Sequence, residues 1–308
     1  MNISTDQPST EAIKLAKAGK NTSGAIGGTW SKVILSVTIL ACSMTVFLLA
    51  PKYAPLFPTN GNPIFAGSVS ATFLLAAFLF KRSAKLSIFW PLAFAFFVAS
   101  SYNLITDLLG GYDPAILGWF GVSQGTNPAM GVSKVYEMLL AVIPFIALTL
   151  LSGSDLKSLY LTKGNINYKW GFGIGALFVI NYLTSVLMFY GTGYTLPKLG
   201  SAILWGLVFA FCNSILEELW VRGLFMKKLL PVVGVVGTVI LTSTWFGVMH
   251  LLGVVYMPAF AIPIYVVNTL TMGIACAILM LKTDSIWGAF GLHAAADLFL
   301  FIALLAVR

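Results

Sequence analysis

Residues 201–228 have the sequence SAILWGLVFAFCNSILEELWVRGLFMKK, which is apolar over most of its length yet contains Glu217, Glu218 and Arg222. A run of this length can cross a bilayer as a helix, because about 20 residues rising 1.5 Å each span the hydrocarbon. Charged side chains are costly at that depth, so they mark a functional site by default. The stretch therefore predicts a transmembrane helix that carries functional residues.

The whole chain has the composition of a membrane protein. Of its 308 residues, 58% are hydrophobic and only 9% are charged, whereas a soluble domain has about 25% charged residues. A bilayer permits helices or closed barrels. Barrel strands alternate apolar and polar residues, but the apolar segments of this chain are continuous. We therefore predict an all-α, polytopic membrane protein with eight or nine transmembrane helices.

Nine apolar segments have the length of a span. They are residues 33–50, 64–80, 87–108, 135–152, 170–189, 201–228, 232–252, 258–281 and 285–307. Glycine and proline between 109 and 134 predict a long loop that includes a short interfacial helix. We divide the chain into a polar, disordered tail (1–32), N-terminal transmembrane helices (33–160) and a functional core (161–308).

The basic residues predict the orientation in the membrane. Of the 18 lysines and arginines, all but Lys52, Lys134, Lys198 and Arg308 fall on one set of alternate loops and helix ends. Such a bias marks the cytoplasmic side, so we expect a cytoplasmic N-terminus and location in the cell membrane. The same bias explains the net charge of +8, and we expect no nucleic-acid partner. The three cysteines show no metal-ligand spacing and are expected to be packing residues.

The chain has only two histidines, and both lie in apolar segments. His250 follows Phe246 by four residues, so the two side chains share a helix face and can pack together. His293 precedes Asp297 by the same spacing. These two can hydrogen-bond each other or point at one ligand atom. A single intramembrane histidine is often a packing residue, but the clustering of ionisable residues in these few strings favours a functional site.

Glu217 and His250 are expected to lie at similar depth. A turn near Pro231 would join their two spans, and both residues lie about 20 to 25 Å from it along their helices. Glu218 and Arg222 are four apart and predict a structural ion pair. Glu217 points about 100° away from Glu218 and is free to face a cavity.

The three strings together resemble the CPBP family, the CAAX-processing or Abi group of Rce1-type intramembrane proteases. The strings that carry the resemblance are Glu217-Glu218-x-x-x-Arg222, Phe246-x-x-x-His250 and His293-x-x-x-Asp297. The resemblance implies a membrane-embedded, glutamate-dependent endopeptidase that needs no cofactor. Its substrate would be a peptide or protein, which can be lipid-modified, as the prenylated tails cut by eukaryotic members are.

The resemblance also implies roles for individual residues. Glu217 and His250 would activate a water, while His293 and Asp297 would form the oxyanion hole. The family usually has asparagine at the last position. Because an ionised carboxylate cannot donate a hydrogen bond, Asp297 would act there in protonated form or by orienting His293. Glu218, Arg222 and Phe246 would be supporting residues.

Two other function classes fit the residues alone. Glu217, His250, His293 and Asp297 have the side-chain types of a zinc or iron site, which would give a metal-dependent membrane protease with metalloendopeptidase-like activity. A non-catalytic binding, immunity or transport protein is the other alternative. Metal analysis of the purified protein distinguishes a metal-dependent protease from a glutamate-dependent one. Activity that survives loss of Glu217 favours the non-catalytic alternative.

Overall fold

The structure is a computed structural model that describes residues 29–52, 57–164, 175, 179, 196–251 and 259–307. Throughout these residues the secondary structure is helical and no strand occurs. The longer helices are α2 (Thr29–Met44), α3 (Pro63–Arg82), α4 (Trp90–Leu109), α5 (Asp113–Trp119), α6 (Asn127–Leu151), α8 (Leu196–Glu217), α9 (Met226–His250), α10 (Ile262–Thr283) and α11 (Trp287–Val307). Two π-helical segments, η1 (Thr45–Leu49) and η5 (Glu218–Gly223), extend α2 and α8. Short 3-10 helices are η2 (Ser87–Phe89), η3 (Gly110–Tyr112), η4 (Leu156–Leu159) and η7 (Ala259–Ala261).

The helices have the length and hydropathy of a polytopic membrane protein. Within the described residues, six helices are long and apolar enough to cross a bilayer, and two shorter apolar helices cover Val33–Leu49 and Trp287–Ile302. The predicted all-α membrane class is thereby confirmed, and eight or nine spans are compatible with these helices. The expected span at 170–189 lies outside the described residues except for positions 175 and 179, and the expected tail falls mostly in the undescribed residues 1–28. The division at residue 160 stays a prediction.

One predicted boundary is wrong. The loop expected to reach residue 134 ends at Thr126, whose side chain accepts from the backbone N–H of Ala129 and caps α6; threonine is a favoured N-cap. The turn expected near Pro231 corresponds to a break at Gly234, three residues further on, where φ is 73° and the helical backbone of α9 is interrupted. Glycine adopts positive φ without steric cost, whereas Pro231 is accommodated within the helix.

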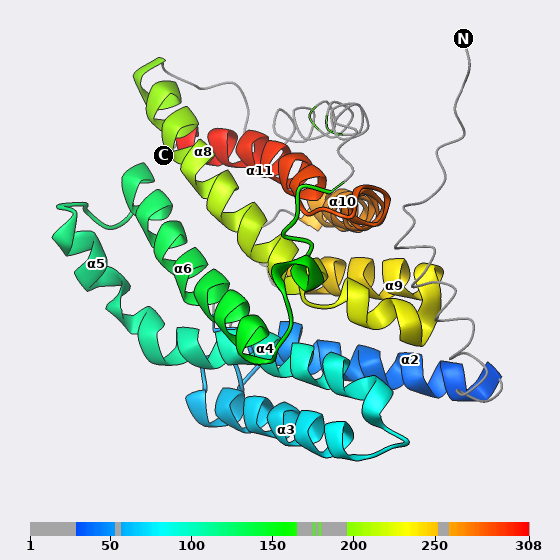
Figure 1. Cartoon of the computed structure of the whole chain (residues 1–308). Coiled ribbons are helices and arrows are strands. Elements are labelled where there is room, and N and C mark those ends of the chain that lie inside the picture. The colour runs from blue at the N-terminus through cyan, green and yellow to red at the C-terminus, as the bar shows by residue number, and fades with distance from the viewer. Residues whose placement is uncertain are drawn as a thin grey trace, which may run out of the picture.

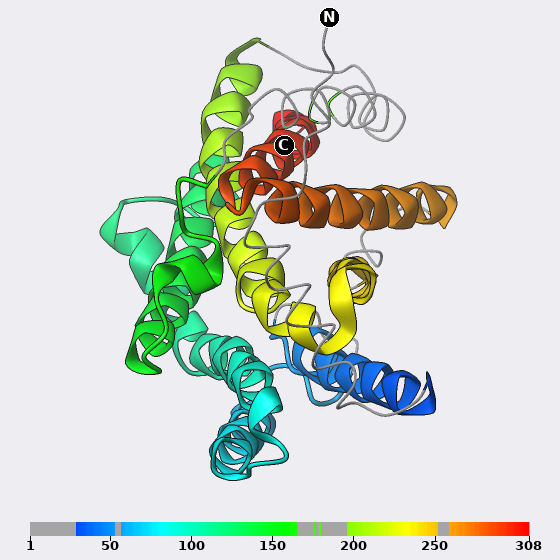
Figure 2. The ribbon, with the colours of Figure 1, turned by 45° about the vertical axis from the view of Figure 1, so that its right-hand side comes forward.

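Helix α8 lies between α11 and α6. Helix α8 packs along both α11 and α6, α9 packs against α10, and α10 meets α11. In Figure 1, α8 runs obliquely between α6 and α11, while α3 lies beside α4 at the far end of the molecule from α11. Figure 2 shows α10 reaching away from its junction with α11. This arrangement brings η5 close to the start of α11 and the end of α9, although these segments are far apart in sequence.

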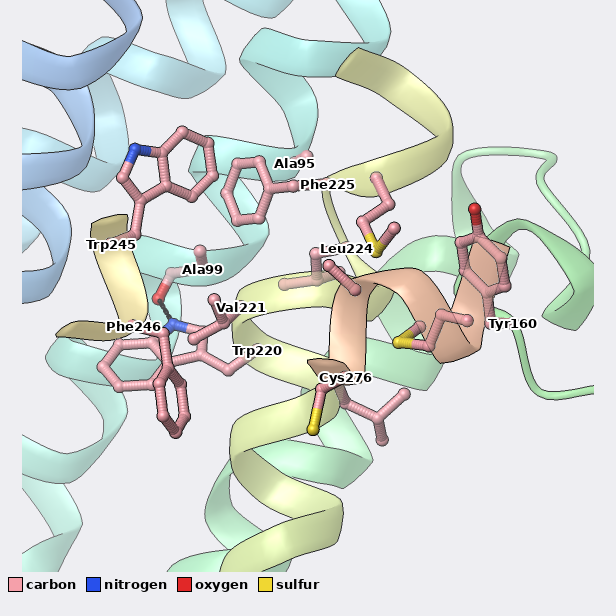
Figure 3. Close-up of a cluster of buried hydrophobic side chains, with 14 of the residues drawn as sticks. Ala95, Ala99, Tyr160, Trp220, Val221, Leu224, Phe225, Trp245, Phe246 and Cys276 are labelled. Carbon is pink, nitrogen blue, oxygen red and sulfur yellow. Dashed lines mark hydrogen bonds between the residues drawn. The ribbon is translucent and has the colours of Figure 1, made fainter. Parts of the chain in front are cut away.

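An aromatic core fixes the turn between α8 and α9. Trp220 donates from Nε1 to the carbonyl oxygen of Ala99 on α4 at 3.1 Å, and Figure 3 shows this bond beside the buried rings of Phe225, Trp245 and Phe246. Phe225 and Trp245 meet edge to face at 5.0 Å between ring centroids. Buried aromatic pairs of this kind add about 0.5–1.5 kcal/mol beyond their area, so η5 is held rigidly against α4 and α9.

Candidate active site

The two glutamates lie where the helical geometry changes from α to π. Helix α8 ends at Glu217, and Glu218 opens the π-helical segment η5, which ends at Gly223. A π-helical turn is rare and is often found at functional sites. The side chain of Glu218 is fully buried, whereas that of Glu217 is 13% exposed. The two neighbouring carboxylates therefore occupy different surroundings, with only Glu217 open to an approaching molecule.

Glu217 faces both histidines. Its Oε2 atom lies 3.8 Å from Nε2 of His250 and 3.7 Å from Nε2 of His293. None of the described residues forms a direct hydrogen bond with this buried oxygen atom. The separations are slightly longer than a direct hydrogen bond, and one bridging water can span each of them. Three side chains from three different helices thus converge on one point.

Glu218 binds two partners at once. Its Oε1 atom lies 2.5 Å from Nη1 of Arg222 and 2.8 Å from Nδ1 of His293. The contact with Arg222 is the ion pair expected from their four-residue spacing. The contact with His293 has no counterpart in the sequence analysis. A carboxylate only accepts hydrogen bonds, so Nδ1 of His293 carries the hydrogen, and the imidazole ring is fixed with Nε2 toward Glu217.

Phe246 and His250 are paired as their spacing predicts. Their ring centroids lie 4.2 Å apart, and the guanidinium of Arg222 stands 4.4 Å over the Phe246 ring. Nδ1 of His250 lies 2.7 Å from the carbonyl oxygen of Phe246. Since a carbonyl only accepts, Nδ1 is the donor. In neutral His250 the lone pair is then on Nε2, the atom that faces Glu217.

Asp297 is held by α8 rather than by its neighbour on α11. Its Oδ2 atom accepts from Nδ2 of Asn213 at 2.9 Å and from Oγ of Ser214 at 3.4 Å. Nε2 of His293 lies 3.6 Å away from the same oxygen, which is too far for a direct hydrogen bond. Of the two arrangements considered for the His293–Asp297 spacing, the geometry favours both groups pointing at a shared position.

The comparison with known families agrees with this assembly. Residues 199–299 match the family described as Type II CAAX prenyl endopeptidase Rce1-like. This segment is an Rce1-like domain. It contains all the site residues named above, and a domain of this family indicates a membrane-embedded endopeptidase of the CAAX type. The resemblance to the CPBP group is thereby confirmed. No curated protein and no solved structure matches the chain.

Two residues of the Rce1-like site escaped the sequence analysis. Asn213 and Ser214 carry no charge, and short polar residues are common in membrane helices, where they bond across to neighbouring helices. Asn213 lies four residues before Glu217, so the two share a face of α8. That spacing was the only signal in the sequence that could have identified it.

The described residues of the Rce1-like domain can be compared with a metal site. Among the residues that the structure describes, no group of three or more histidine, cysteine, aspartate and glutamate side chains has a metal-binding arrangement. The expectation of metalloendopeptidase-like activity is therefore not supported.

Proposed function

We propose that the protein is a glutamate-dependent intramembrane endopeptidase in which Glu217 and His250 activate a water molecule. The single observation that carries the proposal is the position of Glu217 Oε2, 3.8 Å from Nε2 of His250 and 3.7 Å from Nε2 of His293. A water between Glu217 and His250 meets two acceptors, the carboxylate oxygen and the imidazole lone pair. Both would pull on its protons, which is the requirement for general-base catalysis.

The chemical step follows from these roles. The water oxygen attacks the peptide carbonyl carbon while one of its protons passes to the Glu217 carboxylate. The carbonyl oxygen then becomes an oxyanion. When the carbon–nitrogen bond breaks, the leaving amine takes a proton from Glu217, and the carboxylate is regenerated. No covalent intermediate with the enzyme is needed.

His293 and Asp297 are proposed to stabilise the oxyanion. Glu218 fixes His293 through Nδ1, so Nε2 is directed into the site. In the imidazolium form of His293 both ring nitrogens are donors, and Nε2 then donates to the developing negative charge. One donor of this kind contributes about 10²- to 10³-fold in kcat. Asp297 would contribute either as a protonated donor or by holding the position of the polar atoms around His293.

The proposed substrate is a peptide or protein segment, which can include a prenylated protein tail. The domain is similar to CAAX prenyl endopeptidases, and a site inside the bilayer suits a segment delivered in a lipid-anchored form. We also propose that the protein resides in the cell membrane with its N-terminus in the cytoplasm, as the distribution of basic residues favours. Reporter fusions at the N-terminus test this orientation.

The experiment that tests the function is proteolysis by the purified full-length protein in detergent. A library of peptides, with and without a prenylated cysteine, is incubated with the protein and with a Glu217→Gln variant. We expect cleavage by the first and none by the second. Cleavage that survives in Glu217→Gln would overturn the proposed mechanism. Binding without cleavage of any peptide would favour the non-catalytic alternative.

A further inference from the structure

A pocket separate from the catalytic groups opens at the basic end of the helix bundle. It is small and lies where α4 and α6 meet the turn that leads into α9. Its polar wall is formed by Lys228, Thr149, Ser152 and Ser154, and its apolar wall includes Phe94. A cation, three hydroxyl groups and an apolar wall form a composition that suits an amphipathic anion.

Lys228 is the cation of this pocket, and it lacks a carboxylate partner among the described residues. Its Nζ atom donates to the backbone carbonyl of Ser158 at 2.9 Å. The neighbouring Lys227 is instead neutralised by Asp284, at 2.8 Å. An ammonium group has three donors, so Lys228 keeps donors for a ligand.

A second cation lies near the pocket. Trp90 and Pro91, where η2 passes into α4, line the pocket. Nζ of Lys81 lies 4.8 Å from the centroid of the Trp90 ring.

The pocket lies at the end of the bundle where the basic loops meet. The bond from Lys228 to Ser158 and the ion pair from Lys227 to Asp284 join the segments that follow α6 and α10. Basic pockets between transmembrane helices on the cytoplasmic side bind lipid head groups. Trp90 has the amphipathic ring that is enriched at the membrane–water interface.

We infer that this pocket binds the phosphate of an acidic membrane phospholipid. Lys228 supplies the cationic contact, the hydroxyl group of Ser154 supplies a hydrogen bond, and the apolar wall contacts the lipid below its head group. The hydroxyl of Ser152 donates to the carbonyl oxygen of Thr149 at 2.6 Å and supports the polar wall. The bound lipid holds together α4, α6 and the turn between η5 and α9. Because that turn links the helix of Glu218 to the helix of His250, the lipid stabilises the frame of the active site.

The test measures binding and does not depend on peptidase activity. The full-length protein is purified, stripped of lipid and titrated with short-chain phosphatidylglycerol while its thermal unfolding is followed. Phosphatidylcholine of the same chain length and inorganic phosphate are the comparison arms. We expect saturable stabilisation by phosphatidylglycerol alone. Equal stabilisation by phosphatidylcholine overturns the proposal, and equal stabilisation by inorganic phosphate overturns the assignment of a lipid.

Variants assign the binding to this pocket. Lys228→Gln is expected to weaken the apparent affinity for phosphatidylglycerol about fivefold, the effect of removing one basic contact to acidic lipid. Lys157→Gln is the matched control, because Lys157 is an exposed lysine at the same end of the bundle that does not line the pocket. It should bind as the unmodified protein does. Equal weakening in both variants contradicts the proposal.

A second pair of variants covers the case in which Lys228→Gln does not fold. Lys228→Arg keeps the charge and is expected to retain binding. Thr149→Val removes one hydroxyl at nearly constant volume and is expected to weaken binding of phosphatidylglycerol. Unchanged affinity in Thr149→Val together with loss in Lys228→Arg would show that the pocket does not recognise the phosphate.

Discussion

Oε1 of Glu218 lies 2.8 Å from Nδ1 of His293, which is 75 residues away in sequence. Both side chains are fully buried, and Arg222 neutralises the glutamate from the same helix. An isolated buried carboxylate would be strongly destabilising, so the arginine is what makes the contact possible. Glu218 therefore lies behind His293 and is fully buried, whereas Glu217 faces both histidines. We accordingly propose Glu218 as a positioning residue.

Removing the charge of Glu218 should slow the reaction without weakening substrate binding. In Glu218→Gln the ring of His293 loses its charged partner. Changing a group that orients a functional histidine typically lowers activity 10- to 100-fold. We expect kcat to fall within that range while KM stays constant. Steady-state kinetics with one peptide substrate measures both constants. A rise in KM with unchanged kcat would contradict the positioning role.

Removing Arg222 should act mainly on stability. Arg222→Met leaves Glu218 buried without its cation, which costs about 3–5 kcal/mol. The double variant Glu218→Gln/Arg222→Met removes both charges, and we expect it to recover a large part of that loss. Thermal unfolding in one detergent compares the variants. If the double variant is as unstable as Arg222→Met, the ion pair does not explain the loss.

The similar depth of Glu217 and His250 was foreseeable from spacing. Counting along a helical hairpin placed the two residues at equal depth, and their side chains lie 3.8 Å apart. That estimate holds although the break in the helix lies at Gly234, three residues beyond Pro231. The reason is that helix rise tolerates a shift of a few residues, about 1.5 Å each, when the side chains themselves are long.

The partners of Asp297 could not be foreseen in this way. Asn213 is an uncharged residue in an apolar run, and nothing in the sequence says which neighbouring helix it faces. The packing of α8 along α11 is a feature of the tertiary structure, and the order of the helices in the chain does not determine it. The contact between Glu218 and His293 depends on the same packing, as well as on the π-helical turn that follows Glu217.

Glu217 and His250 should behave as a single catalytic unit. Because both act on one water, Glu217→Gln and His250→Ala should each remove most activity, and the double variant should be no worse than either single one. All three should remain folded and membrane-inserted. Peptide cleavage under single-turnover conditions provides the measurement. Losses that multiply in the double variant would instead indicate independent roles.

A matched control for the glutamate is available in α6. Glu137 is a carboxylate within a predicted span. Its Oε2 atom pairs with Nζ of Lys134 at 2.5 Å, and its Oε1 atom accepts from the hydroxyl of Tyr102 at 2.7 Å. The amide oxygen of Glu137→Gln can accept the same bond, so this variant should keep its activity within a few-fold of the unmodified protein. If Glu137→Gln and Glu217→Gln lose activity equally, the loss reflects a disturbed bundle and not a lost base.

Removal of metal ions should leave activity unchanged. The oxygen atom of Asp297 nearest His293 already accepts hydrogen bonds from Asn213 and Ser214, an environment that suits a hydrogen-bonded carboxylate more than a metal ligand. Prolonged dialysis against a strong chelator, followed by metal analysis and a cleavage assay, makes the measurement. Activity that is lost on dialysis and restored by zinc or iron would establish the metal-dependent alternative.

Asp297→Asn should keep or raise the activity at neutral pH. An asparagine amide donates hydrogen bonds at every pH, while its oxygen can still accept from Asn213 and Ser214. Asp297→Ala loses both functions and should reduce kcat by about 10²- to 10³-fold, the cost of one oxyanion donor. Cleavage is measured for both variants from about pH 5 to pH 9, the range over which a site carboxyl and imidazole can change charge.

Asn213→Ala provides the control for Asp297. This change leaves Asp297 in place but removes the shorter of its two hydrogen bonds, so it should have a smaller effect than Asp297→Ala. Suppose instead that Asp297→Asn is inactive and that Asp297→Ala loses metal during purification. The carboxylate would then be a ligand, because asparagine matches the aspartate in shape and hydrogen bonding but lacks the negative charge that a bound cation needs.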